Sequence, residues 1–360
     1  MSEPTLNYVS CPDANGGHRM AWWMWGKPTA SHVVLCVHGL SRQGRDFDVL
    51  ARALCARNPD DVLVVCPDVV GRGRSDWLKD PMGYQVPNYA ADMLVLIDHL
   101  QPATLDWVGT SMGGLIGMVV CGQLSAAGPS QGVKAPSGLT PAASSLPAQT
   151  GTGGRASASR RGTSSAAPAS SASAEDGEVA SVGATGSLPF AVRRLVLNDV
   201  GPTIQWEAIQ RIGAYLGQPV RFVSVEQAAD AMWAVSTSFG PHTREQWLAL
   251  TRYMIKPAGD AAGGFVLHYD PAIAQPFNAT TRESNAQSEA LLWQLYDNIK
   301  ARTLITRGAQ SDLLSVETAR AMTQRGPKAR LVEFAGVGHA PTFVAPDQVQ
   351  VVSDFLLGQE

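Results

Sequence analysis

The chain has 360 residues, 45% of them hydrophobic, so it is long enough to bury a full core in one large domain or two ordinary ones. Its 28 basic and 31 acidic residues give a formal net charge of −3, which excludes the basic excess of a nucleic-acid or anionic-membrane binder. No apolar run in the sequence approaches the roughly 20 residues that a membrane-spanning helix needs, so we expect no membrane partner.

The amino-terminal segment and the cysteines indicate the compartment. Residues 1–17 are polar and lack the basic opening and the apolar stretch of a secretory signal. The five cysteines form no C-x-x-C pair, and such an odd, scattered set is typical of reduced thiols. The sequence therefore predicts a cytoplasmic protein, and it leaves the oligomeric state open.

Short apolar runs alternate along the chain with helix-length amphipathic segments. The predicted strands cover, in chain order, residues 20–25, 33–38, 62–67, 104–109, 194–199, 302–308 and 330–336. Helical periodicity covers residues 47–58, 89–100, 113–124 and 348–358. Strands that are almost continuously apolar, and that alternate with helices, predict a mostly parallel, doubly wound sheet with helices on both faces.

Two segments interrupt this alternation. Residues 125–188 consist mainly of Ala, Ser, Gly, Pro and Thr, which bury too little apolar area to offset the entropy of ordering, so we expect a disordered insertion. Residues 203–298 carry several helical patterns without a convincing series of strands, which predicts a helical cap over the strand ends. The predicted plan is a first core part at 1–124, the insertion, a core strand at 189–202, the cap, and a second core part at 299–360.

A serine between glycines, in the sequence Gly109-Thr110-Ser111-Met112-Gly113, lies where a predicted strand passes into a predicted helix. The Gly-x-Ser-x-Gly pattern alone arises often by chance among 35 glycines, but a strand before it and a helix after it are the context of a nucleophilic serine on a sharp turn. Glycine is needed there because a Cβ atom at the flanking positions would collide with the close-packed strand and helix. The alternative is a glycine-rich turn without chemistry, and we favour the nucleophile.

A serine hydroxyl is a poor nucleophile near neutral pH, so it needs a base and a third group that orients the base. Of the seven histidines, His339 follows the last predicted strand on a glycine-flanked loop, which makes it the candidate base. Asp312 follows the preceding predicted strand and gives the chain order Ser, Asp, His. Asp199 also ends a predicted strand and is a rival for the acid; we favour Asp312. We expect His38 to be a structural residue at a strand end.

Four segments in this order resemble the α/β-hydrolase superfamily. The resemblance to its oxyanion loop lies in HGLSRQGRDF (38–47), to its Asp-x-x-Gly-x-Gly-x-Ser turn in PDVVGRGRSD (67–76), and to its acid and histidine loops in RGAQSDLLS (307–315) and GVGHAP (336–341). It covers the whole chain except 125–188 and weakens in the cap. It implies an α/β-hydrolase fold with a helical cap insertion, in which Ser111 is the nucleophile, Asp312 the acid and His339 the base. The same resemblance implies the backbone N–H groups of Leu40 and Met112 as oxyanion donors.

The resemblance implies a carboxylic ester hydrolase that forms an acyl-enzyme on a small to medium acyl or hydroxyacyl ester and uses no cofactor. The sequence also resembles bacterial intracellular proteins described as hydrolases or acyltransferases, a setting that short hydroxyalkanoate oligomers fit. Because fold does not fix function, a lactonase, a C–C bond hydrolase or an acyltransferase with the same triad stays open. A non-catalytic small-molecule receptor is the alternative from a different class.

Three residues are candidate substrate contacts, namely Arg42, Trp233 and His268. Arg42, beside the oxyanion loop, is placed to hold a substrate carboxylate, although a salt bridge to a nearby aspartate is the more common role for such a residue. Trp233 belongs to a group of cap aromatic residues that either line an apolar pocket or pack helices together, and His268 also lies in the cap. The sequence has neither H-E-x-x-H nor a Cys/His cluster with ligand spacing, so we expect no metal.

Overall fold

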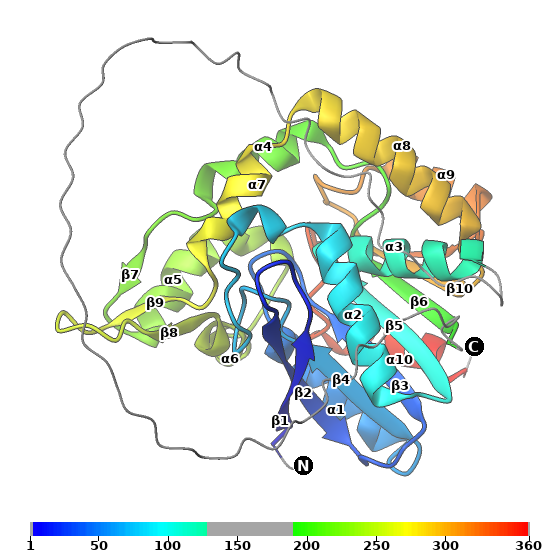
Figure 1. Cartoon of the computed structure of the whole chain (residues 1–360), viewed down its shortest axis with the longest axis horizontal. Helices are drawn as coiled ribbons and strands as arrows, with labels where there is room; N and C mark the ends of the chain where they lie inside the picture. Colours follow the sequence, from blue (N-terminus) through cyan, green and yellow to red (C-terminus); the bar gives the residue numbers. More distant parts are fainter. Residues whose placement is uncertain (1–2, 128–189, 359–360) are drawn as a thin grey trace, which may run out of the picture.

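The structure is a computed structural model, and it describes residues 3–127 and 190–358. Within these residues a mostly parallel eight-stranded sheet has the order β1-β2-β4-β3-β5-β6-β10-β11 (Figure 1). The strands are β1 (Thr5–Cys11), β2 (His18–Gly26), β3 (His32–Val37), β4 (Val62–Pro67), β5 (Thr104–Thr110), β6 (Val192–Asn198), β10 (Arg302–Gly308) and β11 (Arg330–Phe334). The strands from β4 to β11 are parallel, and β1 and β2 are antiparallel to their neighbours. The predicted sheet is thereby confirmed.

Helices cover both faces of this sheet, which explains why the central strands are largely buried and mostly apolar. All residues of β3 and β4 are buried. In β3, Val33 and Leu35 belong to the core that contains residues of α2 and α3, whereas Val34 and Cys36 belong to the core that contains residues of α1 and α10. The helices of the core are α1 (Asp48–Arg57), α2 (Val86–Leu100), α3 (Met112–Ala127), α9 (Val316–Gln324) and α10 (Pro346–Leu357).

The sequence did not predict β1 or α9. Strand β1 lies at the edge of the sheet, where it pairs along its whole length with β2 and leaves much of one face exposed. Its alternation of polar and apolar residues therefore lacks the continuous apolar run that marks the central strands. Helix α9 is short and largely polar, so its buried stripe consists of only a few residues.

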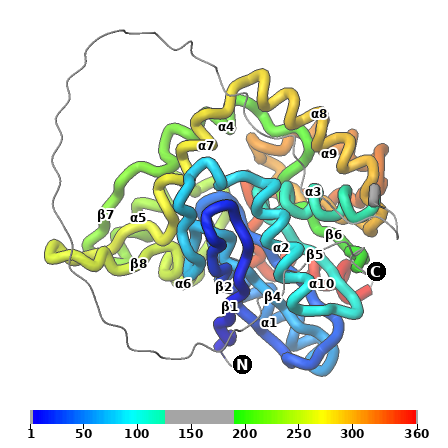
Figure 2. The backbone as a smooth tube through the Cα atoms, in the orientation of Figure 1, coloured from blue at the N-terminus to red at the C-terminus, as the bar shows by residue number. Residues whose placement is uncertain are grey.

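Between β6 and β10 the chain forms helices and a small second sheet. The helices are α4 (Trp206–Tyr215), α5 (Val225–Ser236), α6 (Arg244–Met254), α7 (Ala274–Asn278) and α8 (Arg282–Asn298). Strands β7 (Arg221–Phe222), β8 (Ile255–Pro257) and β9 (Phe265–Leu267) form an antiparallel sheet in the order β7-β9-β8. Figure 2 shows α5 to α7 and this sheet together on the left of the view, with α4 at the upper middle. Helix α8 packs instead along α3, where a Cβ atom added to Gly122 would lie 2.9 Å from Cα of Leu295.

The segment predicted as an insertion, residues 125–188, lies from residue 128 onward outside the described residues.

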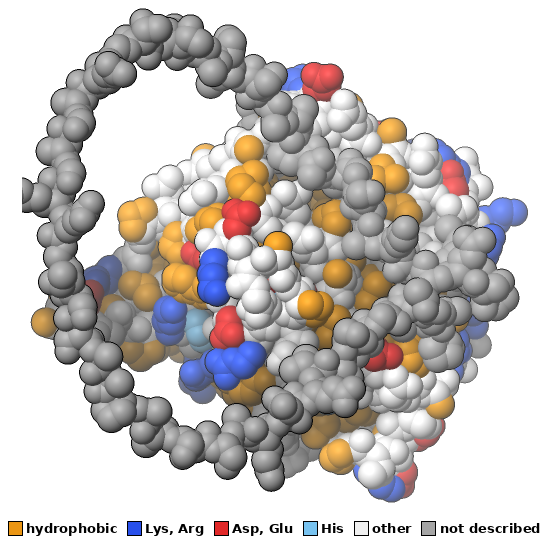
Figure 3. Space-filling model, in the orientation of Figure 1, with side chains coloured by type: hydrophobic (Ala, Val, Ile, Leu, Met, Phe, Trp, Pro, Cys, Tyr) orange, Lys and Arg blue, Asp and Glu red, His pale blue; other side chains and the backbone are white. Residues whose placement is uncertain are grey.

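In the described ranges 3–127 and 190–358, no helix has both the length and the apolar character needed to cross a bilayer. All five cysteines are free. Figure 3 shows basic and acidic side chains interspersed on the visible face, as expected for a chain whose charges nearly balance.

Candidate active site

Ser111 occupies a sharp turn between β5 and α3. Its φ of 51° lies in the left-handed region that residues with a Cβ atom rarely adopt, and its N–H donates to the carbonyl of Asn198 over 2.9 Å. A Cβ atom added to Gly109 would lie 2.3 Å from the carbonyl oxygen of Gly113, and one added to Gly113 would lie 1.9 Å from that of Val37. The two glycines are therefore required sterically, and the turn presents the Ser111 side chain at the end of the strand.

His339 lies on the loop after β11 and connects Ser111 to a carboxylate. Its Nε2 is 3.1 Å from Oγ of Ser111, and its Nδ1 is 2.7 Å from Oδ2 of Asp199. A carboxylate can only accept, so Nδ1 carries the proton and Nε2 is free to accept the Ser111 proton. The Asp199 side chain is fully buried and that of His339 is 15% exposed. A hydroxyl, an imidazole and a carboxylate thus form a continuous path for proton transfer.

The predicted contact between His339 and Asp312 is wrong, because the carboxylate that meets the imidazole belongs to Asp199. Asp312 instead forms an ion pair with Arg211 of α4 over 2.7 Å, and its side chain is 54% exposed. The physical reason is the direction of the two turns. Asp199, directly after β6, has a φ of 54°, and its carboxylate points to the sheet edge next to Ser111, whereas the loop after β10 directs Asp312 outward. Asp199, the rival that the sequence offered, is the carboxylate in contact with His339.

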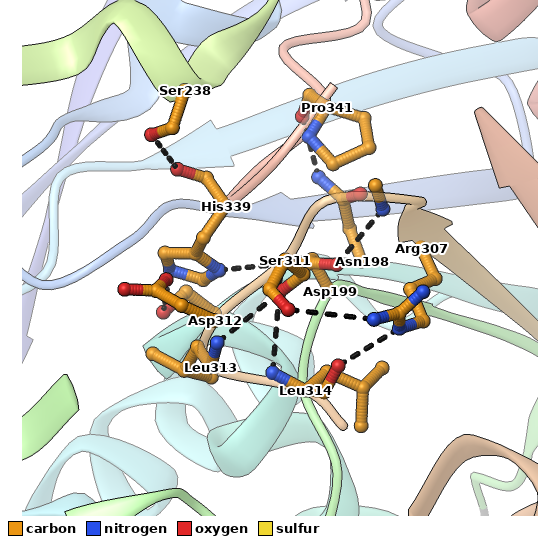
Figure 4. Close-up of polar contacts among 12 residues, drawn as sticks. Asn198, Asp199, Ser238, Arg307, Ser311, Asp312, Leu313, Leu314, His339 and Pro341 are labelled. Atoms are coloured by element: carbon orange, nitrogen blue, oxygen red, sulfur yellow. Dashed lines mark hydrogen bonds and ion pairs between the residues drawn. The ribbon is translucent and has the colours of Figure 1, made fainter. Parts of the chain in front are cut away.

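The Asp199 carboxylate accepts hydrogen bonds at both oxygens. Oδ1 accepts the N–H of Gly308 over 2.9 Å, and Oδ2 accepts the hydroxyl of Ser311 over 2.6 Å in addition to His339 (Figure 4). The backbone N–H of Asp199 donates to the carbonyl of Thr306 over 2.7 Å. A buried charge needs such partners, and these contacts also fix the direction of the carboxylate.

Asn198 joins three parts of the site and was not singled out from the sequence. Its Nδ2 donates to Oγ1 of Thr110 over 3.0 Å and to the carbonyl of Pro341 over 2.8 Å, and its Oδ1 accepts from Oγ1 of Thr306 over 2.8 Å. The side chain is completely buried. A polar residue within the apolar run of β6 was the available signal, because a buried amide is retained only where it has partners.

The predicted oxyanion loop lies against Ser111. A Cβ atom added to Gly39 would be 3.7 Å from Cβ of Ser111. His38 is buried; its Nδ1–H donates to the carbonyl of Gly39 over 2.7 Å, and its Nε2 accepts the N–H of Val69 over 2.9 Å. Burial lowers the pKa of His38 to about 3, so it is neutral and structural, as expected. The backbone donors Leu40 and Met112 stay predictions.

The turn that follows β4 holds the predicted oxyanion loop through hydrogen bonds. Asp68 accepts the N–H groups of Gly44 over 2.7 Å and Arg74 over 2.8 Å, so one carboxylate ties the oxyanion loop to the turn. Burial raises the pKa of Asp68 to about 6 against the effect of these donors. Arg72, fully buried, donates from Nε to the carbonyl of Leu40 over 2.8 Å. The PDVVGRGRSD motif is therefore structural here and holds the oxyanion loop in place.

A small pocket adjoins the site, and one of the three candidate substrate contacts reaches it. Its lining includes Thr110, Ala340 and Arg42. Arg42 donates from Nη2 to Oδ1 of Asp46 over 2.8 Å and also pairs through Nε, so its guanidinium already holds a carboxylate. Its contact with substrate stays a prediction.

The other two candidates are engaged within the cap. Trp233 packs edge-on against Trp247 with ring centroids 5.1 Å apart, which is the helix-packing alternative. His268 contacts the carbonyl of Tyr253 through Nδ1, and burial lowers the pKa of its imidazole to about 4. Neither contact involves Ser111 or His339.

One other cluster has the residue types of a metal site. Ligand atoms of Cys11, His18 and Asp92 lie within 4.8 Å of one another. Both ring nitrogens of His18 already meet carboxylates, Nδ1 that of Asp13 at 3.1 Å and Nε2 that of Asp92 at 3.0 Å. Burial, followed by the negative charge of Asp92, raises the pKa of the Cys11 thiol, which favours its protonated form. These contacts form a hydrogen-bonded network between the β1–β2 hairpin and α2.

Comparison with known proteins agrees with the fold. A family model described as alpha/beta hydrolase fold matches residues 32–135. A protein of Cupriavidus necator named 3-hydroxybutyrate-oligomer hydrolase is 41% identical over 359 residues, which is 99% of each chain. The chain belongs to the α/β-hydrolase family and is a hydrolase.

Two solved structures are also similar along nearly the whole chain. An alpha/beta hydrolase from Novosphingobium aromaticivorans has a TM-score of 0.69 and 27% identity, with 99% of both chains covered. A protein from Rickettsia typhi has a TM-score of 0.71 and 22% identity, also with 99% of both chains covered, and that likeness concerns the fold.

Proposed function

We propose that the chain is a serine ester hydrolase that cleaves short oligomers of 3-hydroxyalkanoates. The observation that carries the proposal is the hydrogen-bonded series Ser111, His339 and Asp199 at the end of the sheet. The 41% identity to the Cupriavidus necator protein along the whole chain supports the substrate class, since that protein is named for 3-hydroxybutyrate oligomers. An ester between hydroxyacyl units is the bond that such a series of side chains attacks.

The proposed reaction has two steps. Oγ of Ser111 attacks the ester carbonyl while Nε2 of His339 takes its proton, and Asp199 stabilises the imidazolium that results. The backbone N–H groups of Leu40 and Met112 stabilise the oxyanion, and two such donors commonly contribute about 3 kcal/mol each. His339 then protonates the departing hydroxyl of the next unit. Water, activated by the same histidine, releases the hydroxy acid from Ser111.

Turnover of a defined set of substrates tests this function. The purified protein and its Ser111→Ala variant are assayed with the dimer and trimer of 3-hydroxybutyrate, p-nitrophenyl butyrate and a small lactone, and both proteins are treated with a fluorophosphonate probe. We expect the wild type to cleave the oligomers, to take up the label rapidly and to lose both properties by at least about 10³-fold in the variant.

The other outcomes have different meanings. If the protein prefers the lactone, the proposed substrate class is wrong, but Ser111 stays the proposed nucleophile. Neither turnover nor labelling by the wild type would contradict the enzyme and favour the receptor alternative. Activity that persists in Ser111→Ala, with correct folding shown by circular dichroism, would remove the proposed nucleophile.

A further inference from the structure

The loop after β10 directs two adjacent polar side chains to opposite sides. Ser311 points to Asp199 and donates to Oδ2 (Figure 4). Asp312 instead pairs with Arg211 at the surface. We propose that Ser311 is a positioning residue of the active site, whose hydroxyl holds the Asp199 oxygen that contacts His339. The inference rests on the proposed function, because it assigns Ser311 a part in the same proton path.

The direction of the Ser311 proton follows from the neighbouring donors. Oγ of Ser311 lies 3.2 Å from the backbone N–H groups of both Leu313 and Leu314, and these groups can only donate. The one hydroxyl hydrogen is therefore left for Oδ2 of Asp199, at 2.6 Å. Accepting two hydrogen bonds polarises the hydroxyl and strengthens the bond that it donates.

The loop that carries Ser311 is fixed by a buried arginine. Arg307 of β10 donates from Nε to the carbonyl of Leu314 over 2.8 Å and from Nη1 to Oε1 of Glu333 over 2.6 Å. Its side chain is almost completely buried although it is charged, and these acceptors satisfy it. Ser311 is thus presented by a rigid segment, as a residue that positions another must be.

Oδ2 of Asp199 depends on Ser311 for its second hydrogen bond. Oδ1 accepts the N–H of Gly308, so Oδ2 would retain His339 alone if the hydroxyl were removed. The terminal torsion of an aspartate is broad, and without Ser311 only the N–H of Gly308 would hold the carboxylate independently of the imidazole that it orients. Because Ser311 contacts the acid and lies outside the series from Ser111 to Asp199, its loss should lower kcat and leave KM nearly unchanged.

The test compares Ser311→Ala with a matched serine on the same loop. Ser315 caps α9 by accepting the N–H of Thr318 over 3.1 Å, so Ser315→Ala removes the same atom from a residue that contacts only the helix end. We expect about a tenfold lower kcat for p-nitrophenyl butyrate in Ser311→Ala, with KM within about twofold of wild type. Ser311→Thr keeps the hydroxyl and should recover most of the activity. Ser315→Ala should keep the wild-type kcat.

A spectroscopic measurement reports the contact without turnover. The proton between Nδ1 of His339 and Asp199 should give a far-downfield NMR resonance, which its loss in Asp199→Asn would assign. This resonance should move upfield in Ser311→Ala and stay in place in Ser315→Ala. Wild-type kcat and an unmoved resonance in Ser311→Ala would overturn the inference.

Failure of the inference and failure of the proposed function are distinguishable. Ester turnover that disappears in Ser111→Ala, together with unchanged kinetics in Ser311→Ala, contradicts only the role of Ser311. If Ser311→Ala does not fold, Ser311→Cys supplies a weaker donor of nearly the same shape. An intermediate kcat for that variant supports the inference, and a wild-type kcat overturns it.

Discussion

At the scale of single residues, the two oxygen-bearing side chains of the site stand on strained backbone. Ser111 and Asp199 have φ values of 51° and 54°, a conformation that costs of order 1–3 kcal/mol for residues with a side chain. Each directly follows a strand, and the last residues of these strands, Thr110 and Asn198, pair with each other. Two like turns at adjacent strand ends therefore place the hydroxyl and the carboxylate at one edge of the sheet, where His339 can join them.

The assignment of Asp199 instead of Asp312 as the proposed acid gives a direct prediction at this scale. Asp199→Asn should lower kcat by about 10³- to 10⁴-fold, because an amide can donate to Nδ1 and stabilise the wrong imidazole tautomer. Asp312→Asn should stay within about threefold of wild type, since it removes one exposed ion pair worth at most about 1 kcal/mol. The measurement is kcat at saturating ester, with thermal unfolding as the control for folding. A severe effect in Asp312→Asn beside a mild one in Asp199→Asn would restore the assignment made from the sequence.

Sequence motifs identify Ser111 and His339 but do not identify the other residues of the site. The glycines around Ser111 mark the close-packed turn from strand to helix, and His339 follows the last strand, so local sequence marks both residues. Asp199 and Asp312 both follow apolar strands, and the choice between them depends on which turn directs its carboxylate inward. Ser311 is an ordinary loop residue until the direction of that turn is known.

At the scale of elements, burial decides which strands and helices the sequence reveals. Strands β3 and β4 are buried at every position and, apart from His32, apolar because helices cover both faces, and their predicted and observed ranges differ by at most one residue at each end. Edge strand β1 and the strands of the small second sheet, which have two or three residues each, carry no such run. Their positions follow from pairing with partners that are remote in sequence, which a local pattern does not contain.

A titratable side chain, His18, joins the hairpin of β1 and β2 to α2. Burial alone would lower the pKa of His18, but the hydrogen bond and charge of Asp92, followed by those of Asp13, raise it above its ordinary value of 6.5. A histidine with a raised folded-state pKa stabilises the fold fully below the unfolded value, and this contribution disappears as pH rises through the folded value. The stabilisation from His18 is therefore present at pH 6 and declines as the pH rises above 6.5.

This linkage predicts a pH-dependent difference between wild type and His18→Gln. The free energy of unfolding of the variant should be lower than that of the wild type at pH 6, and the difference should become smaller at pH 8.5, because glutamine does not carry the charge. Urea unfolding at both pH values measures this difference. An equal difference at pH 6 and pH 8.5 would show that the imidazolium does not provide the stabilisation.

At the scale of the whole molecule, the segment between β6 and β10 forms hydrogen bonds with the core on more than one side. Oη of Tyr84, before α2, donates to Oδ2 of Asp270 over 2.6 Å. On the other side the carbonyl of Ser238 accepts the N–H of Gly338, the residue directly before His339. The loop that carries His339, the proposed base, is therefore in direct contact with the cap, and a change in the cap can reach the proposed proton path.

His242 and Thr342 offer the clearest measurement of this connection. Burial lowers the pKa of His242, so it is neutral near pH 7; its Nδ1–H donates to the carbonyl of Gly240 over 2.9 Å, and its Nε2 accepts the Thr342 hydroxyl over 2.8 Å. Thr342 lies three residues after His339, so this bond steadies the loop from the cap.

His242→Ala and Thr342→Val should each lower kcat/KM by about three- to tenfold, because each removes the same hydrogen bond. The double variant should be no worse than the more severe single variant, which corresponds to a coupling energy of about 1 kcal/mol between cap and core. The cycle is measured with one ester at pH 7.5, where His242 is neutral in the wild type. Effects that simply add would show that the contact transmits nothing to the base, and the histidine loop would then owe its position to the core alone.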